Sequence, residues 1–353
     1  MTIQFSDNST ELETFRTIIL YGANTASYKF ALGQALLELP IEKQSFVRLD
    51  ELAVPFYKHM VEHVRSGKRQ TSANSSKYLY ACQLFSEGKL TEDEIIALTA
   101  STGFQYVIDA FPKLKRQYGQ GAQFYTKSVI DNVKGITIDD SLYRLRELAQ
   151  ANNLPEEVEG RWNLVESSWD AKGDKLIIEY DDTEKLFCGR RVQSNKSYLN
   201  SHIRAPVTHA RKPLSGYQKG KCFYCFDDIS IVPNQPNTAA VDHFFPISLQ
   251  YKVGTDLNLN LNGIWNLVLT CKDCNGEEAW SKWAHTPDYS LLPALMRRND
   301  YYISSKHPLG ETIQLETGNT ASQRANYIKE VFKVAKQVTP YEWKPRLIKG
   351  TPF

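Results

Sequence analysis

Two pairs of cysteines in this chain have the spacing of a metal site. Cys222 and Cys225 form one Cys-x-x-Cys pair, and Cys271 and Cys274 form a second pair further along the chain. Four thiolates in two such pairs can close a tetrahedron around Zn²⁺, and a site filled by four sulfurs leaves no open position for a substrate. The sequence therefore predicts a structural zinc ion that joins two distant segments.

Residues that could hydrolyse a phosphodiester lie between the two cysteine pairs. Asp242 and His243 end a short apolar run and are followed by Pro246. A neutral imidazole can take the proton of an attacking water near pH 7, and a carboxylate is a preferred ligand of Mg²⁺. The plainer interpretation of Asp242 and His243 is an ion pair on the surface near the end of a strand.

Two asparagines accompany this pair. Asn266 lies in a second apolar run that leads into the second cysteine pair, and Asn275 directly follows Cys274. Asn275 could offer an amide oxygen to a hard divalent ion, or it could cap a helix that follows. Asn266 could also be an ordinary turn residue. His285 is a fallback third ligand, although a single histidine more often has a structural role.

Together these residues resemble the HNH, or ββα-metal, endonuclease family, whose pattern is Cys-x-x-Cys, Asp-His-x-x-Pro and Asn-Leu-x-x-x-Cys-x-x-Cys-Asn. The resemblance is confined to residues 217–283. It implies that His243 is the general base and that Asn266 holds the loop bearing His243 through backbone hydrogen bonds. It also implies that Asp242 and Asn275 bind a catalytic Mg²⁺ or Mn²⁺ ion.

A basic segment precedes the first cysteine pair. Residues 189–221 contain no aspartate or glutamate, whereas the formal net charge of the whole chain is only +2. Such a segment suits the phosphate backbone of a nucleic acid, although it could also be a solvated linker. The residues expected to contact nucleic acid are Arg204, Arg211, Lys212, Lys219 and Lys221. The expected partner is DNA, double-stranded by default, with RNA as an alternative.

Apolar residues at helical spacing predict a mainly helical region in the first half of the chain. The expected helices begin near residue 9 and then cover 26–39, 52–64, 75–87, 91–100, 139–151 and 156–168. Residues 175–187 predict a short hairpin that closes this region, and 321–337 predict an amphipathic helix. The expected fold class is α+β, with a mainly helical N-terminal domain, a zinc-stapled ββα-metal module and a helical C-terminal extension.

A chain of 353 residues usually forms about two domains. The expected division is a helical domain at 1–188, a basic connector arm at 189–216, a nuclease module at 217–290 and a helical extension at 291–353. The helical domain could bind a regulatory protein partner.

Composition also bears on location and function. Met1–Glu13 is polar and acidic, and no apolar run is long enough to span a bilayer, so we expect a cytoplasmic protein without a membrane partner. The leading interpretation is a metal-dependent HNH endonuclease that cleaves DNA. By analogy with HNH proteins of similar layout, it would act in restriction or anti-phage defence. The alternative is a non-catalytic zinc-ribbon protein that binds nucleic acid. A pure binder has no physical reason to keep the Asp-His pair and both asparagines together.

Overall fold

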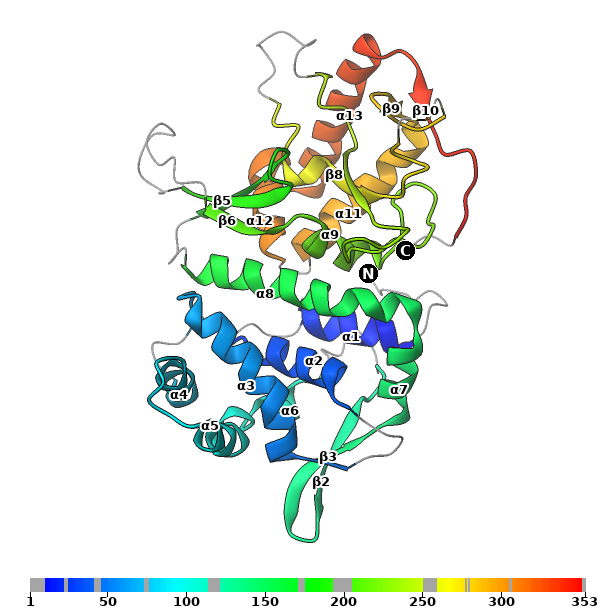
Figure 1. Ribbon diagram of the computed structural model, residues 1–353. Coiled ribbons are helices and arrows are strands. Elements are labelled where there is room, and N and C mark those ends of the chain that lie inside the picture. The colour runs from blue at the N-terminus through cyan, green and yellow to red at the C-terminus, as the bar shows by residue number, and fades with distance from the viewer. Residues whose placement is uncertain are drawn as a thin grey trace. The chain divides into compact units, whose positions relative to one another are not determined.

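The chain folds into two compact units, Met1–Lys172 and Gly173–Phe353 (Figure 1). The structure is a computed structural model that describes residues 10–21, 25–40, 46–72, 76–113, 121–170, 175–192, 205–249, 259–276, 278, 280–304 and 307–350. For residues 175, 176, 190–192 and 205–207 it describes the backbone alone. Helices alternate with small sheets, so the expected mixture of the two element types is confirmed.

Helices dominate the first unit. They are α1 (Thr10–Tyr21), α2 (Tyr28–Glu38), α3 (Leu49–Arg65), α4 (Lys77–Ser86), α5 (Glu92–Leu98), α6 (Val107–Ala110), α7 (Asp140–Glu147) and α8 (Leu154–Asp170), with a π turn at Thr99–Gly103 and a 3-10 turn at Ala149–Asn153. The helices expected from apolar spacing are therefore present. The start of α5 shows the local cause, because Thr91 and Glu94 form a capping box that satisfies backbone N–H groups.

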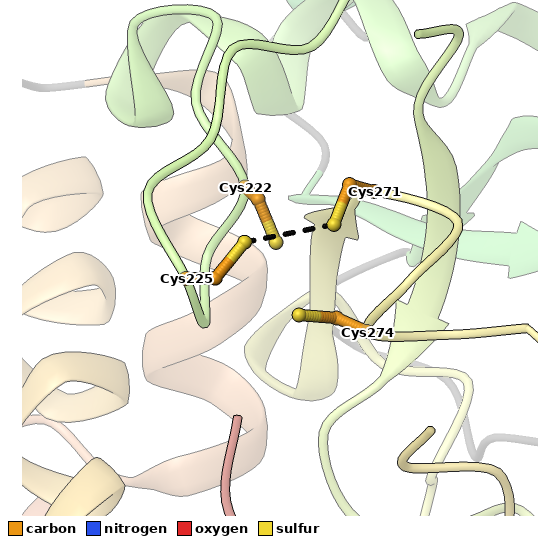
Figure 2. A group of neighbouring side chains, drawn as sticks. All are labelled: Cys222, Cys225, Cys271 and Cys274. Atoms are coloured by element: carbon orange, nitrogen blue, oxygen red, sulfur yellow. Dashed lines mark hydrogen bonds between the residues drawn. The ribbon is translucent and has the colours of Figure 1, made fainter. Parts of the chain in front are cut away.

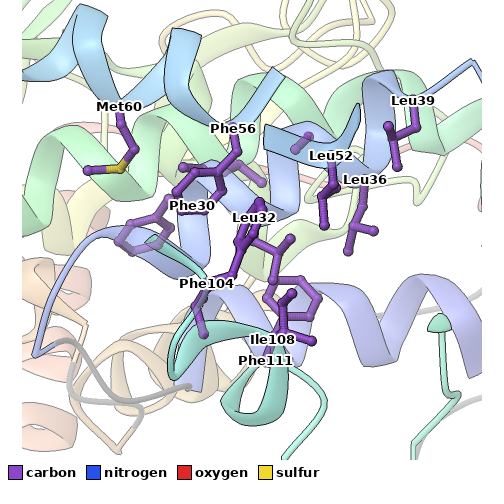
Figure 3. Close-up of a cluster of buried hydrophobic side chains, with 14 of the residues drawn as sticks. Phe30, Leu32, Leu36, Leu39, Leu52, Phe56, Met60, Phe104, Ile108 and Phe111 are labelled. Atoms are coloured by element: carbon purple, nitrogen blue, oxygen red, sulfur yellow. The ribbon is translucent and has the colours of Figure 1, made fainter. Parts of the chain in front are cut away.

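An apolar core lies between α2, α3 and the turns that follow α5 (Figure 3). Phe30 and Leu36 of α2 and Phe56 of α3 are fully buried in it. The Phe104 ring packs edge-on against Phe56, with 4.8 Å between the ring centroids. Burying each large apolar side chain contributes roughly 1.5–3 kcal/mol, so this cluster is a main source of the unit's stability.

A small antiparallel sheet also belongs to the first unit and was not predicted. It consists of β1 (Phe46–Arg48), β2 (Tyr125–Ile130) and β3 (Val133–Ile138), in the order β1-β3-β2. Asp131 and Asn132 connect β2 to β3, and both have positive φ angles, 49° and 64°. Asp and Asn tolerate this left-handed conformation, which is typical of a two-residue hairpin turn. An Asp-Asn dipeptide between two apolar runs was the signal that could have predicted it.

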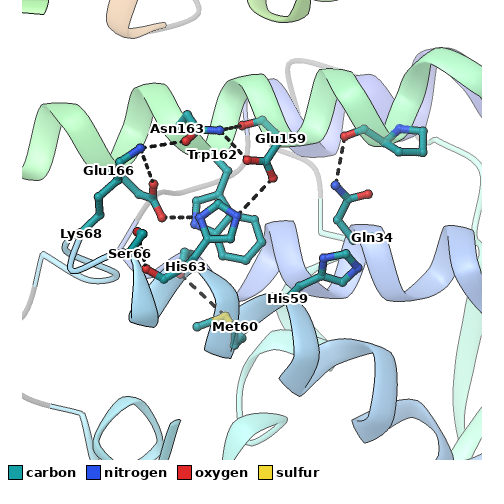
Figure 4. A network of polar contacts seen from close by, with 12 residues as sticks. Gln34, His59, Met60, His63, Ser66, Lys68, Glu159, Trp162, Asn163 and Glu166 are labelled. Carbon is teal, nitrogen blue, oxygen red and sulfur yellow. Dashed lines mark hydrogen bonds and ion pairs between the residues drawn. The ribbon is translucent and has the colours of Figure 1, made fainter. Parts of the chain in front are cut away.

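A buried polar cluster joins α3 to α8 (Figure 4). The His63 ring donates from Nδ1 to Glu166 Oε1 at 2.6 Å and from Nε2 to Glu159 Oε2 at 3.1 Å. It also stacks on Trp162, with 3.6 Å between the ring centroids. Burial alone would lower the pKa of His63, but the hydrogen bonds to Glu159 and Glu166 outweigh it and raise the pKa to about 9. The charged imidazolium therefore ties the two helices at neutral pH.

The second unit begins with an antiparallel sheet of three strands. They are β4 (Lys175–Asp181), β5 (Leu186–Val192) and β6 (Ala205–His209), paired in this order. β4 and β5 form the predicted hairpin, but it belongs to the second unit and does not close the first. Because β5 pairs with β6, the units divide after Lys172 and not after the expected residue 188. The expected connector arm, 189–216, is thus partly sheet and partly helix where it is described.

A second strand pair and several helices make up the rest of this unit. The elements are α9 (Arg211–Gln218), β7 (Ala240–His243), η4 (Ile264–Asn266), β8 (Leu267–Thr270), β9 (Thr286–Pro287), η5 (Tyr289–Leu291), α11 (Leu292–Ser304), α12 (Pro308–Thr317), α13 (Ala321–Val338) and β10 (Glu342–Trp343). β7 pairs with β8 antiparallel, and β9 pairs with β10 parallel. α13 is the predicted amphipathic helix. Of the helices that the structure describes, none has the length and apolar character needed to cross a membrane.

A buried arginine ties α11 to the start of β8. Arg298 is 1% exposed, and it donates from Nη1 to Ile264 O at 2.8 Å and from Nη2 to Leu267 O. Asn299 adds a bond from Nδ2 to Trp265 O at 3.2 Å. The expected C-terminal extension, 291–353, therefore packs on the hairpin of the expected nuclease module and supports its second strand.

Candidate functional site

The four cysteines of the two Cys-x-x-Cys pairs come together in space (Figure 2). Their sulfur atoms all lie within 4.8 Å of one another, and Cys225 Sγ is 3.6 Å from Cys271 Sγ. Four thiolates around Zn²⁺ lie about 2.3 Å from the metal and therefore about 3.8 Å from one another. All four residues are buried, so the cluster could hold a zinc ion. Within the described ranges no other group of three His, Cys, Asp or Glu side chains has such geometry.

Backbone hydrogen bonds hold the two cysteine turns in register. The first turn is attached to β8 by the bond from Phe223 N to Leu269 O at 2.9 Å. The second turn follows β8 directly and is closed by the bond from Asn275 N to Cys271 O at 3.1 Å. The pKa of the Cys271 thiol is lowered because the neighbouring sulfurs, Cys222 first, hydrogen-bond to it. The same contacts raise the pKa of the Cys222 and Cys274 thiols, so the four sulfurs share protons as one group.

Gln218 connects α9 to this pair of turns. Its Nε2 donates to Leu269 O at 2.7 Å and to Lys221 O at 2.9 Å, while its Oε1 accepts from Leu269 N at 2.7 Å. The residue is 1% exposed. A buried amide with both ends bonded to backbone fixes one geometry, because any shift would leave polar groups unpaired. Sequence reasoning missed Gln218, since no local pattern reveals such a long-range contact.

Asp242, the expected metal ligand, is bonded to two protein side chains. The Tyr224 hydroxyl donates to Oδ2 at 2.7 Å, and Lys282 Nζ donates to Oδ1 at 3.1 Å. Asp242 is 6% exposed. Each carboxylate oxygen thus accepts a hydrogen bond in a buried setting. A divalent ion at Asp242 would compete with the Lys282 ammonium group and the Tyr224 hydroxyl for these oxygens.

Lys282 has a second contact, and sequence reasoning did not single it out. Its Nζ also donates to His243 O at 2.8 Å, and its backbone N donates to Cys274 O at 2.8 Å. Burial lowers the pKa of Lys282, while the neighbouring Asp242 carboxylate acts in the opposite direction. The side chain therefore links the second cysteine turn to the end of β7.

His243 has partners different from those of Asp242. The half-buried ring donates from Nε2 to Asn262 Oδ1 at 2.8 Å, and its centroid lies 6.0 Å from that of Tyr180. Burial lowers the pKa of His243, so the neutral imidazole prevails at pH 7. Adjacent residues of a strand point to opposite faces, and β7 stays regular through both residues. The bend that would bring Asp242 and His243 to one pocket is not present.

Asn266 makes the backbone contacts that the resemblance implied. Its Oδ1 accepts from Phe245 N at 2.8 Å, and its Nδ2 donates to Phe245 O and Leu261 O, both at 2.9 Å. The residue is fully buried. One amide thus joins the loop after His243 to the segment that carries Asn262.

Asn275 lies directly after the second cysteine turn and is half-buried. In the described stretch no hydrogen bond joins its amide to Asp242 or His243. The residues described between 275 and 285 form turns and bends, so the helix of a ββα module does not follow β8 directly. Asn275 therefore does not cap a helix. The fallback ligand His285 is exposed, and its backbone N donates to Lys282 O.

The expected nucleic-acid contacts differ in their surroundings. Arg204 lies outside the described residues, while Arg211 and Lys212 begin α9 and are half-buried. Lys219 ends α9 in a left-handed conformation, with φ 54°. Lys221 is only 8% exposed, and its Nζ donates to Asp228 Oδ1 at 3.0 Å. An ammonium group already paired with a carboxylate of the same chain is less able to bind a phosphate. Lys221 is therefore a weaker candidate for contact with nucleic acid.

Comparison with known proteins found no relative of this chain. A scan against models of protein families, a search of curated proteins and a search of solved structures each gave no match. What the site can do follows from its own side chains.

Proposed function

We propose that this chain is an HNH-type endonuclease that hydrolyses phosphodiester bonds of DNA, with His243 as the general base. One observation carries the proposal: a neutral, half-buried imidazole is held by Asn262 at the end of a strand, beside a loop that Asn266 fixes. A base in a fixed place can accept the proton of a water that attacks phosphorus. The four cysteines support this by holding the hairpin, and zinc bound there has no catalytic part.

The proposal includes a requirement for Mg²⁺ or Mn²⁺, and the resemblance to HNH endonucleases is the ground for it. Such an ion would neutralise charge on the phosphate oxygens and the departing oxygen. An ion held by Asp242 would compete with the Lys282 ammonium group for the carboxylate.

The buried pairing of Asp242 favours a second candidate function. An acidic residue that serves only to anchor Lys282 and Tyr224 is consistent with a zinc-ribbon module that binds nucleic acid without cleaving it. The half-buried Arg211 and Lys212 would then supply phosphate contacts. His243 would have a structural role in this case.

A plasmid-nicking assay separates the two candidates. The full chain is incubated with supercoiled DNA in Mg²⁺, in Mn²⁺ and in EDTA, next to the His243→Ala variant and the His59→Ala control, whose ring contacts Glu38 in the first unit. We expect nicking by the wild type and the control in either ion, and little by His243→Ala, with DNA binding retained by all three. Equal nicking by wild type and His243→Ala would rule out His243 as the base. DNA binding without any nicking would favour the ribbon.

A further inference from the structure

The hydrogen bond between His243 and Asn262 determines which ring nitrogen carries the proton. Asn262 Oδ1 is a carbonyl oxygen and can only accept, so Nε2 of His243 must be the donor at their 2.8 Å contact. A neutral imidazole carries one N–H proton, and its other nitrogen has a free electron pair. The Nδ1 atom is therefore the basic nitrogen in this arrangement.

We propose that Asn262 is a positioning residue, which fixes His243 in the Nε2-protonated tautomer and thereby makes Nδ1 the atom that takes the proton from water. This inference rests on the proposed function, because it names how the base of that reaction is prepared. During the step, the water O–H bond breaks as its oxygen forms a bond to phosphorus, and the proton passes to Nδ1, giving an imidazolium ion. The ester bond between phosphorus and the departing oxygen breaks, and that oxygen takes a proton from solvent water. Asn262 remains bonded to Nε2–H throughout and touches neither water nor phosphate.

The segment that carries Asn262 is held on three sides. Its carbonyl oxygen accepts from Tyr180 N of β4 at 3.2 Å, and the preceding carbonyl, Leu261 O, accepts from Asn266 Nδ2 at 2.9 Å. The next residue, Gly263, allows close packing, because a Cβ there would lie 2.5 Å from Glu316 Oε2. The amide is thus presented by a rigid turn, which is what a group that orients another side chain requires.

The other charged groups near His243 do not hold its ring. Lys282 Nζ donates to the His243 carbonyl oxygen, not to the imidazole, and Asp242 is turned to Tyr224 and Lys282. Among the parts of the chain that the structure describes, Asn262 is the hydrogen-bond partner of the ring. Replacing Asn262 by a residue that cannot accept a hydrogen bond should therefore let the His243 ring exchange between its two neutral tautomers. The imidazole itself would remain available as a base.

Nitrogen-15 NMR of the full chain with labelled histidine tests this without reference to activity. His243 is assigned from the spectrum of His243→Gln, and spectra are taken where the ring is neutral. We expect a Nε2-protonated ring with a slowly exchanging proton in the wild type. The proton should exchange rapidly and the two nitrogen shifts should average in Asn262→Leu, while Asn262→Asp, which keeps an acceptor, should restore the bound proton. A wild-type ring protonated on Nδ1, or a slowly exchanging Nε2 proton in Asn262→Leu, would overturn the inference.

Kinetics of the same variants give the second readout. Asn262→Leu should lower kcat roughly ten- to a hundredfold with little change in KM, because general-base catalysis contributes about 10²–10⁴ and only part of it is lost. Asn262→Asp should recover most of kcat. Asn260→Leu is the matched control, since the Asn260 amide lies in the same turn but donates to Glu316 Oε1 at 2.5 Å. Unchanged kcat in Asn262→Leu would also overturn the inference, whereas a wild type that nicks nothing would instead refute the proposed function.

Discussion

Lys282 and Asp242 form a buried ion pair, with 3.1 Å between Nζ and the carboxylate and with side chains 1% and 7% exposed. Removing one partner from such a pair leaves an uncompensated charge in the interior. Replacing either partner alone should therefore destabilise the second unit.

Lys282→Met should be strongly destabilising. We expect the free energy of unfolding of the second unit to fall by roughly 3 kcal/mol, because Asp242 would keep its charge with only the Tyr224 hydroxyl as donor. Urea titration measures the change, and the double variant Lys282→Met with Asp242→Asn should recover part of it. Lys344→Met, at an exposed position, is the control. A stable Lys282→Met protein would show that the pair contributes little.

The cysteine cluster should bind one zinc ion per chain. Metal analysis of the purified protein should find zinc in the wild type and in Cys82→Ala, whose thiol is buried elsewhere in the first unit. Cys225→Ser should lose the zinc, because a hydroxyl is a poor substitute for a thiolate ligand. Strong chelators should lower the melting temperature of the second unit in the wild type and leave Cys225→Ser unaffected. Zinc retained by Cys225→Ser would place the metal elsewhere.

Asn266→Ala should disturb the hairpin while sparing the metal. The change leaves the buried groups Phe245 N, Phe245 O and Leu261 O without their partner, and each such loss costs about 1–3 kcal/mol. We expect lower stability of the second unit and loss of nicking, with zinc content unchanged. Full activity in this variant would mean that the loop after His243 does not depend on the amide.

The first unit should lose stability in mildly alkaline solution. The folded-state pKa of His63, about 9, lies above the ordinary value of about 6.5, so the charged ring stabilises the folded state. This contribution is fully present below about pH 6.5 and is lost as pH rises towards 9. Thermal unfolding between these limits should show the decline in the wild type and a weaker one in His63→Gln. Identical pH profiles would exclude His63 as the cause.

Charge removal on α9 should weaken binding to DNA. Replacing Arg211 and Lys212 by glutamine should lower affinity for duplex DNA and flatten its salt dependence, because fewer counterions are released on binding. Lys221→Gln should have little effect on the salt slope, since its ammonium group is paired with Asp228. Fluorescence anisotropy at several salt concentrations measures both. If the affinity of the double variant for DNA still depends steeply on salt concentration, residues 189–216 would be a linker and not a DNA-binding segment.

Local sequence predicted the helices of the first unit because their determinants are local. Capping at Thr91 and apolar spacing suffice for a helix wherever it packs. The hairpin of β4 and β5 was also predicted, but it belongs to the second unit, because β5 pairs with β6 and this pairing has no local signal in the sequence. In the sheet around β3, the pairing with β1 has no local signal because β1 is far from it in sequence, whereas the Asp131-Asn132 turn between β2 and β3 was a local signal that was overlooked.

The candidate site was predictable only in part. Spacing alone predicted the four-cysteine cluster, and the backbone contacts of Asn266 match the role implied by resemblance. Lys282 and Asn262 could not be found, because a lysine or asparagine acquires such a role only through tertiary contacts. The helix expected after Asn275 is absent from the described residues, where turns lead to η5 instead.

The two bonds of Lys282 have a mechanical consequence. Its main chain is attached to the sulfur cluster through Cys274, and its ammonium group is attached to the carbonyl of His243. Lys282 therefore joins the backbone of the second cysteine turn to the backbone at the end of β7. If removal of zinc loosens that turn, the main chain that carries His243 should loosen with it, even while Asn262 still accepts from the ring.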